Sequence, residues 1–463
     1  MGNIILTNRQ QLQQRWAPFS SLFLSITSFT VNILPYLLLP QLILRQNVVI
    51  LNALPFVLFY TFRRTVLFLF RGYHPRAERL MMIGLIAGTL GSLCGLFGGW
   101  LPIFWDLAGV GIGIASALLP PAIRVFGQRQ KQQTPAKKIR FDALYQYGAL
   151  LLLMLLIQLA GGNHISWSFA GMTLYLLLGC LGFWVSSLRQ PWTPIHFHNP
   201  KRITVNFILT AAIFVGLINL RMTRNEGTIT SLLHGLIFLA IILPIGLAIF
   251  SWRMARGNSR ITWTIRARGF LRGMCIDFVA VYGTIYCFVL LGSAFYVWVI
   301  LMYVVAMAIG APLLSFLAKK IPAISRANLT LLLLVLGLIL TFWQPLYLVG
   351  ILCLRIVVGE LNREVITELD AETPLIPDEE YLVAPRLLSL GGLTLQMVLW
   401  LIMISVANQQ QFKVASLLTS YAHKTVAANF TSLISTTHGW LVLVMLLATT
   451  IVYLIDRHHR ATK

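Results

Sequence analysis

Long apolar runs separated by short polar segments recur from one end of the chain to the other. The runs are about 18–25 residues long, which is what a helix needs to cross a hydrocarbon core about 30 Å thick. A helix satisfies its own backbone hydrogen bonds in lipid. A membrane barrel would instead alternate apolar and polar residues along short strands, a pattern that the sequence lacks. The pattern therefore predicts an all-α polytopic membrane protein.

The apolar runs predict about fourteen transmembrane helices. The short pair 328–343 and 345–358 is the weakest part of this count. The predicted spans are 18–43, 48–62, 80–99, 101–123, 143–160, 167–187, 203–220, 229–252, 273–292, 295–317, 328–343, 345–358, 387–406 and 439–455.

The positions of the basic residues test this count. With the N-terminus in the cytoplasm, the inside segments hold 30 Lys and Arg and the outside loops hold 5, while Arg355 falls within a span. Basic residues favour the cytoplasmic side of a membrane. If one helix had been missed, every later loop would be assigned to the wrong side and the split would be lost. The split predicts a multi-pass protein of a bacterial cytoplasmic membrane, with both termini and the loops 127–142 and 253–272 in the cytoplasm.

The net charge of +22 and the pI near 10.3 have the same explanation. Such values can indicate a nucleic-acid-binding protein. Here, however, the basic residues form short clusters that flank apolar helices, and the chain is 57% hydrophobic with a mean hydropathy of +0.78. We therefore expect contacts with anionic lipids and no nucleic-acid partner.

Motifs for enzymes and metal sites do not occur in the sequence. The five cysteines lie in apolar runs without CxxC or Cys/His spacing, and there is no Walker sequence, HExxH or GxSxG. Cysteines in such runs are typical of small buried apolar side chains. The sequence predicts no cofactor, no metal and no catalytic residue, and hence a protein that is not an enzyme.

Two predicted loops differ from the others. The cytoplasmic segment 359–386 carries 8 of the 14 acidic residues, among them the run Asp378, Glu379 and Glu380. It is either a solvated surface or a latch that pairs with basic cytoplasmic loops. The outside segment 407–438 is long and polar.

The predicted spans fall into three groups. Six spans form an N-terminal bundle over 1–188, a two-helix insertion with basic linkers occupies 189–269, and six spans form a C-terminal bundle over 270–463. Between the second and third spans of the last group, "GAPLLSFLAKKIPAISR" has a leading glycine and three basic residues. The fourth span, "WDLAGVGIGIASALLPPAIR", has a Gly-x-Gly-x-Gly run before a Leu-Leu-Pro segment and Arg124.

These features resemble the major facilitator superfamily in its fourteen-span, 6+2+6 form, and the fourth span is similar to that of cyanate and nitroimidazole porters. The resemblance implies two pseudo-symmetric six-helix halves that rock about a central cavity. Two departures stand out. Lys319 occupies the place of the acidic residue in the loop motif, and the antiporter signature expected on 143–160 is absent.

Charged residues inside the membrane are expensive, so each is a functional candidate. Asp106 near the outer end of its span is either an interfacial carboxylate or a site that loads a proton or cation. Asp277 is either a helix-start acid paired with the preceding arginines, Arg268 and Arg272, or a cavity carboxylate. Arg355 is either a side chain that snorkels to the cytoplasmic interface or a counter-ion. Two further arginines, Arg63 and Arg64, become intramembrane if their helix runs on to Phe70.

Aromatic and small residues add further candidates. Tyr282 and Tyr286 lie four residues apart on one helix face, either in an interface or in a cavity wall. Glycines repeat every four residues on the third and fourth spans, which favours close helix packing. They are Gly91, Gly95, Gly99, Gly109 and Gly113.

The sequence predicts a secondary active transporter, proton-coupled and monomeric, that moves a small molecule by alternating access. One alternative is a fourteen-span flippase for a lipid-linked saccharide, in which spans 1 and 7 would be equivalent instead of spans 1 and 9. A second is a membrane glycan polymerase or ligase that uses His164, Lys413, His423 and Lys424 on the outer face.

Overall fold

The computed structural model divides the chain into two compact units, each considered by itself below. Unit 1 comprises Met1–Asn225 with Pro377–Leu382, and unit 2 comprises Glu226–Ile376 with Val383–Lys463. The described residues are 8–43, 49–70, 76–133, 165–186, 262–291, 293–372, 382–412 and 430–461, with isolated positions at 148, 149, 152, 208, 210–212, 214–216, 241 and 245.

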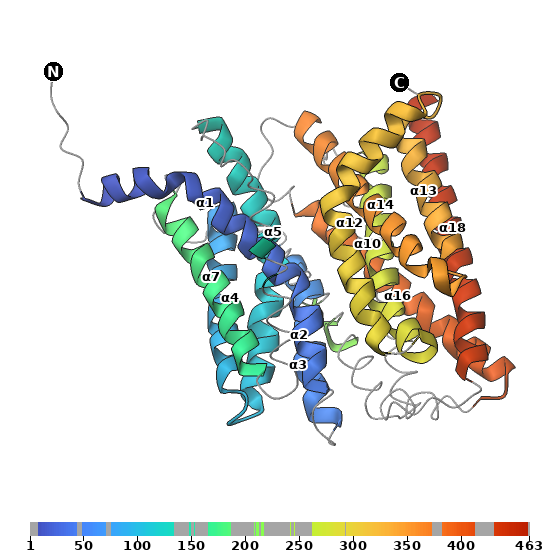
Figure 1. The fold of residues 1–463 in the computed structure, drawn as a ribbon, viewed down its shortest axis with the longest axis horizontal. Coiled ribbons are helices and arrows are strands. Elements are labelled where there is room, and N and C mark those ends of the chain that lie inside the picture. Colours follow the sequence, from blue (N-terminus) through green and yellow to red (C-terminus); the bar gives the residue numbers. More distant parts are fainter. Residues whose placement is uncertain are drawn as a thin grey trace. The chain divides into compact units, whose positions relative to one another are not determined.

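Unit 1 is a bundle of long helices (Figure 1). The first predicted span is divided into two helices by Pro35, because proline lacks the backbone N–H that would continue the helical hydrogen bonds. The helices are α1 (Asn8–Ile33), α2 (Pro35–Ile43), α3 (Val49–Leu69), α4 (Ala77–Phe97), α5 (Ile103–Gln133) and α7 (Ile165–Val185).

Unit 2 is also helical, and its first span changes helix type along its length. The segment runs through α10 (Trp263–Asp277), the π-helical turn η1 (Phe278–Tyr282), α11 (Gly283–Tyr286) and a second π-helical turn, η2 (Cys287–Leu291). The remaining elements are α12 (Ser293–Lys320), α13 (Arg326–Leu340), the 3₁₀ turn η3 (Gln344–Leu346), α14 (Tyr347–Glu372), α16 (Val383–Gln409) and α18 (Phe430–Ala461).

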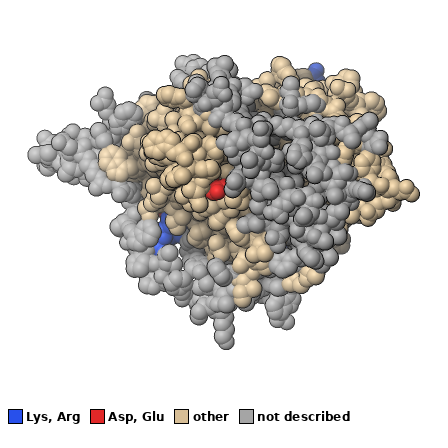
Figure 2. Space-filling view, turned by 90° about the horizontal axis from the view of Figure 1, so that it is seen from below, with Lys and Arg blue, Asp and Glu red and all other residues tan. Residues whose placement is uncertain are grey.

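Within the described ranges, each predicted span corresponds to a helix, including the weak pair 328–343 and 345–358. Seven of these helices are long and apolar enough to cross a membrane. The full count of fourteen stays a prediction, because spans 143–160, 203–220 and 229–252 lie outside the continuous described segments. In the view from below, the described surface shows few charged side chains (Figure 2).

The largest extensions beyond the predicted spans in unit 2 are those of α10, α14 and α18. Helix α10 begins at Trp263, inside the predicted linker, because the side chain of Thr262 caps it by accepting a hydrogen bond from the Ile265 N–H at 3.3 Å. Helix α14 continues to Glu372, since Glu, Arg and Leu are good helix formers even where the hydropathy falls. Helix α18 begins at Phe430, so part of the predicted outside segment 407–438 is helical.

The same pairs of spans contact one another in both units. The contacts α4·α5, α3·α5, α1·α7, α1·α5 and α4·α7 in unit 1 correspond to α13·α14, α12·α14, α10·α18, α10·α14 and α13·α18 in unit 2. By this correspondence α1 is equivalent to α10, so span 1 is equivalent to span 9, as the facilitator arrangement requires.

The glycines of α5 lie against two different helices. A Cβ atom added at Gly109 would collide with the carbonyl oxygen of Pro55, and one at Gly113 would lie 2.6 Å from the carbonyl oxygen of Phe59, both on α3. Gly111, between them, faces α4 instead. The Gly-x-Gly-x-Gly run therefore brings the α5 backbone close to two neighbours at once.

Helix α4 approaches α5 at its own glycine. A Cβ atom on Gly91 would lie 2.8 Å from the Cα atom of Gly111, and a Cβ atom on Gly95 would overlap the ring of Phe169 on α7. Gly99 is different, because it lies beyond the end of α4 and a Cβ atom there meets nothing within 4 Å. The packing role predicted for Gly99 is therefore wrong.

We predict that Gly111→Ala destabilises the protein by about 1–3 kcal/mol, the usual cost of overpacking. The added methyl group would lie 2.7 Å from the Cα atom of Gly91, where backbone and not a flexible side chain must move. Gly99→Ala is the matched control and should change stability by less than about 0.5 kcal/mol. Denaturation in detergent measures both, and equal stability of the two variants would contradict the packing argument.

Candidate functional site

Arg63 lies within α3, which runs on to Leu69, and it is held inside unit 1. Its two Nη atoms donate to the backbone oxygen and to Oδ1 of Asn32, each at 3.0 Å. The guanidinium also lies over the rings of Tyr36, at 5.0 Å, and Phe59, at 5.9 Å. Asn32 and the aromatic rings thus compensate for part of the lost hydration.

Arg64 is buried more deeply than Arg63. It is 1% exposed, and its guanidinium lies 5.1 Å from the centre of the Tyr60 ring. Both arginines therefore lie within α3, which ends at Leu69, one residue before the Phe70 that the sequence set as the condition for intramembrane candidates.

Asp106 lies in the first turn of α5, directly after the buried Trp105. Its Oδ1 atom is buried and has no hydrogen-bond partner among the described residues. A carboxylate in the first turn interacts favourably with the helix dipole. The position is compatible with both sequence interpretations of this residue, an interfacial carboxylate and a site that loads a proton or cation.

Asp277 lies at the far end of α10, about 21 Å along the helix from Trp263. It is 0% exposed, and the Nε2 group of Gln396 on α16 donates to its Oδ2 atom at 2.7 Å. The interpretation of Asp277 as a helix-start acid is therefore wrong, because α10 begins much earlier than the predicted span. Arg268, which was expected as a partner, contacts other carboxylates.

Arg355 lies well inside α14 (Tyr347–Glu372), whereas the sequence placed it near the end of its predicted span. The predicted span stopped at 358, whereas the apolar helical stretch runs from Gln344 to Glu368. The guanidinium lies over the ring of Tyr303 on α12, 4.8 Å from its centre. Its Nε atom is buried and has no hydrogen-bond partner among the described residues. The Nε–H group of Arg355 can therefore still donate a hydrogen bond to another group.

Tyr282 and Tyr286 are both buried and form part of one aromatic cluster. Tyr286 stacks on Tyr347 with ring centres 5.0 Å apart, and Tyr282 stacks on His438 at 5.6 Å. Sequence reasoning missed His438, because the last predicted span began at residue 439. A histidine directly before an apolar run was the available signal.

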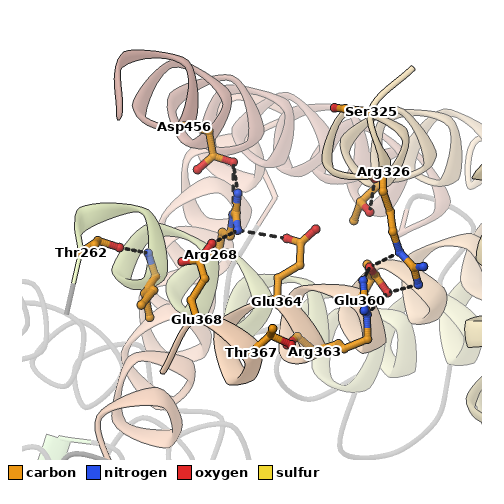
Figure 3. Close-up of polar contacts among 12 residues, drawn as sticks. Thr262, Arg268, Ser325, Arg326, Glu360, Arg363, Glu364, Thr367, Glu368 and Asp456 are labelled. Atoms are coloured by element: carbon orange, nitrogen blue, oxygen red, sulfur yellow. Dashed lines mark hydrogen bonds and ion pairs between the residues drawn. The ribbon is translucent and has the colours of Figure 1, made fainter. Parts of the chain in front are cut away.

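The acidic segment 359–386 is helical as far as Glu372, and its first acids pair within unit 2 (Figure 3). Glu360 is 3% exposed and accepts hydrogen bonds from Arg326, at 2.6 and 3.0 Å, and from Arg363. The first half of the segment is therefore not a plain solvated surface. The run Asp378, Glu379 and Glu380, on which the latch depends, lies outside the described residues.

Arg268 joins three helices of unit 2 (Figure 3). It bonds to Asp456 on α18 at 2.8 Å and, from the opposite side, to Glu368 at 2.8 Å and Glu364 at 3.4 Å, both on α14. Arg268 and Asp456 are both almost fully buried. Their mutual pairing is what makes two buried charges tolerable in this place.

An ion pair also joins the third and fourth spans in each unit. Arg129 on α5 pairs with Glu78 on α4 at 2.9 Å, and Glu360 on α14 pairs with Arg326 on α13 at 2.6 Å. The basic and acidic partners have exchanged helices between the two units. The equivalence of the units therefore extends to the place of an ion pair but not to its polarity.

Comparison with solved structures identifies the fold. A POT-family peptide transporter in complex with sulfate matches with a TM-score of 0.57 and 14% identity over 98% of this chain and 99% of that one. A POT-family transporter with 5-aminolevulinic acid matches at 0.53 and 16%, and one with a thioalcohol-conjugated peptide at 0.54 and 16%, each over 96% of both chains.

No protein-family signature matches the sequence, and no curated protein is significantly similar to it. At these low identities the structural likeness defines the fold alone. The chain has the fold of the solved POT-family transporters across nearly its whole length, and this is the fold that the resemblance to the major facilitator superfamily implied. His164, Lys413, His423 and Lys424, which the polymerase alternative requires, lie outside the described residues.

We predict that Arg268→Ala destabilises the protein by about 3–5 kcal/mol, because it leaves buried carboxylates without their cation. Glu368→Gln is the matched control, since the Glu368 side chain is 36% exposed and its ion pair should contribute at most about 1 kcal/mol. Unfolding in detergent measures both. Comparable losses in the two variants would show that the cluster does not hold the helices together through Arg268.

Proposed function

We propose that this protein is a proton-coupled secondary active transporter that moves a small molecule across a bacterial cytoplasmic membrane by alternating access. The observation that carries the proposal is the match to solved transporters over 98% of the chain. The corresponding helix contacts in the two units support it, since alternating access uses two equivalent bundles around one site. The same correspondence favours this arrangement over that of the flippase.

The proposed substrates are peptide-like or amino-acid-derived small molecules. The solved transporters of this fold include complexes with a conjugated peptide and with 5-aminolevulinic acid. In this chain, Arg355 is the stronger candidate to bind a substrate carboxylate. Its Nε atom has no partner among the described residues, whereas Arg63 already donates twice to Asn32. Arginine binds carboxylates through paired N–H donors, which suits such substrates.

Asp277 is the proposed coupling carboxylate. It is buried on the first span of unit 2 and is bonded to a neutral amide group of Gln396. When Asp277 takes up a proton it gains a donor, and rotation of the Gln396 amide can present its oxygen as the acceptor. Both protonation states then keep a hydrogen bond, as a reversible proton carrier requires. Asp106, at the start of α5, is proposed as the site that loads protons or a cationic substrate.

We predict that Asp277→Asn abolishes pH-driven accumulation and leaves substrate exchange partly intact, because exchange needs no net proton release. The measurement is uptake of a labelled dipeptide or of 5-aminolevulinic acid in proteoliposomes with an imposed pH gradient. Asp106→Asn should instead shift the pH optimum or the apparent affinity. Arg355→Gln, in the same assay, should raise the substrate concentration for half-maximal uptake and keep the gradient dependence.

Gradient dependence retained in Asp277→Asn would assign its carboxylate to packing against α16. Failure of every variant and of the wild type to take up either probe would reject the proposed substrate class. Unfolding curves for each variant provide the control that loss of transport is not loss of fold.

A further inference from the structure

His438 lies at the centre of an aromatic cluster in unit 2 and is 2% exposed. The imidazole stacks on the ring of Tyr282 at 5.6 Å and lies 4.7 Å from the rings of Tyr286 and Phe342, measured between centres. Phe278 is next, at 6.1 Å. These rings come from η1, α11 and the turn after α13, so α18 presents its histidine to several elements at once.

The hydrogen bonds around His438 define where its proton lies. The hydroxyl group of Thr341 donates its single hydrogen to the carbonyl oxygen of Leu338, at 2.6 Å. Thr341 must therefore accept from Nε2 of His438, which is 3.1 Å away. The Nδ1 atom of a neutral imidazole is then an acceptor, and the hydroxyl group of Tyr282 lies 3.1 Å from it. For a neutral histidine, the geometry therefore assigns the hydrogen to Nε2.

The Tyr282 hydroxyl has a second acceptor already in place. The carbonyl oxygen of Ile434, one turn before His438 on α18, lies 3.4 Å from the same hydroxyl oxygen. If a proton is added to Nδ1, that nitrogen becomes a donor, and the Tyr282 oxygen can accept from it while its own hydrogen turns to Ile434. One proton is gained, no covalent bond other than N–H forms, and every polar atom involved keeps a partner.

We propose that His438 is a proton-binding site, and that Tyr282 is its positioning residue, whose hydroxyl changes its hydrogen bond from Nδ1 to the Ile434 carbonyl when the imidazole is protonated. The ring of Tyr282, which is stacked on the imidazole, would stabilise the resulting cation through its π face. Tyr282 ends a π-helical turn, and such turns are frequent at functional sites within helices.

The other groups against this site are uncharged at neutral pH. Tyr286 and Cys287 come from the first span of unit 2, and Tyr347 comes from α14. Among the described residues, no Asp, Glu, Lys or Arg contacts the imidazole, so no neighbouring charge fixes its protonation state. No charge among the described neighbours therefore favours one protonation state of His438, and its hydrogen bonds can accommodate both.

On one side, the ring of Phe342 lies between the imidazole of His438 and the surface of unit 2. The ring of Phe342 meets the imidazole edge-on and is 47% exposed, in the turn between α13 and α14. That turn is an outer loop in the topology predicted from the basic residues. On the proposed function, which this part of the inference rests on, His438 on α18 would receive protons at the outer end of unit 2, and Asp277, on the same span as Tyr282, would carry them further.

The test is ¹⁵N NMR of the histidine side chains in the full-length protein in detergent, with the His438 signals assigned by their loss in His438→Gln. At high pH the wild type should show a neutral ring with hydrogen on Nε2 and a hydrogen-bonded Nδ1. Acidification should convert it reversibly to the doubly protonated ring. Tyr282→Phe should keep the hydrogen on Nε2, since Thr341 still accepts it, but should move the Nδ1 signal to that of a nitrogen without a hydrogen bond.

Tyr286→Phe is the matched control, since Tyr286 packs on the imidazole as closely but makes no hydrogen bond to it. It should leave the Nδ1 signal unchanged. A wild-type ring with hydrogen on Nδ1, an equal effect of the two tyrosine variants, or no protonation at any pH at which the fold persists would each overturn the proposal. The spectra involve no substrate, so this failure is distinguishable from a failure of transport.

Discussion

A polar group that is removed from water must find a partner, and this constraint governs both units. The bundles consist mainly of apolar helices, so each buried charge in them is costly unless an opposite charge, a hydrogen bond or an aromatic face compensates for lost hydration. Arg268 meets the constraint with carboxylates from two helices, Arg63 with Asn32 and aromatic rings, and Asp277 with the amide group of Gln396. The partners that satisfy these groups are also what fixes the helices against one another.

The degree of compensation separates structural from functional candidates. Arg268, Glu360 and Arg326 take part in multiple ion pairs and hydrogen bonds, which suits a fixed contact. Asp277 and His438 each have a neutral partner whose hydrogen bond can reverse, and the Nε atom of Arg355 has no hydrogen-bond partner among the residues described. Groups of the second kind can change protonation or bind a ligand without leaving a charge stranded. They are therefore the groups on which the proposed transport depends.

Hydropathy and charge predicted where the chain crosses the membrane, but not where its helices end. The spans within the described ranges all correspond to helices, since a long apolar run has few alternatives in lipid. Helix ends depend on other properties, such as the Thr262 cap and the helix-forming residues after 358. Because of these, α10 begins earlier and α14 ends later than predicted, so Asp277 and Arg355 lie elsewhere within their helices than the sequence suggested. The missed start of α18 likewise concealed His438.

Partners between distant segments were less predictable still. The pairing of Arg268 with Asp456 joins residues 188 positions apart, and nothing local in the sequence selects Asp456 over other acids. The glycines show both outcomes. Their spacing predicted close packing on α4 and α5. It did not predict that Gly109 would face α3 while Gly111 faces α4. It also wrongly included Gly99, which lies beyond the end of α4.

The central claim is that two equivalent bundles expose one site alternately to the two sides of the membrane. The most direct test is a pair of spin-label distance measurements between the units in lipid, with native cysteines replaced. One pair of labels joins the predicted cytoplasmic ends, at Phe19 and Thr367, and the other joins the predicted outer ends, at Trp100 and Asn408. As pH and substrate are varied, the account predicts that one distance lengthens while the other shortens. Distances that change in the same sense, or do not change at all, would contradict it.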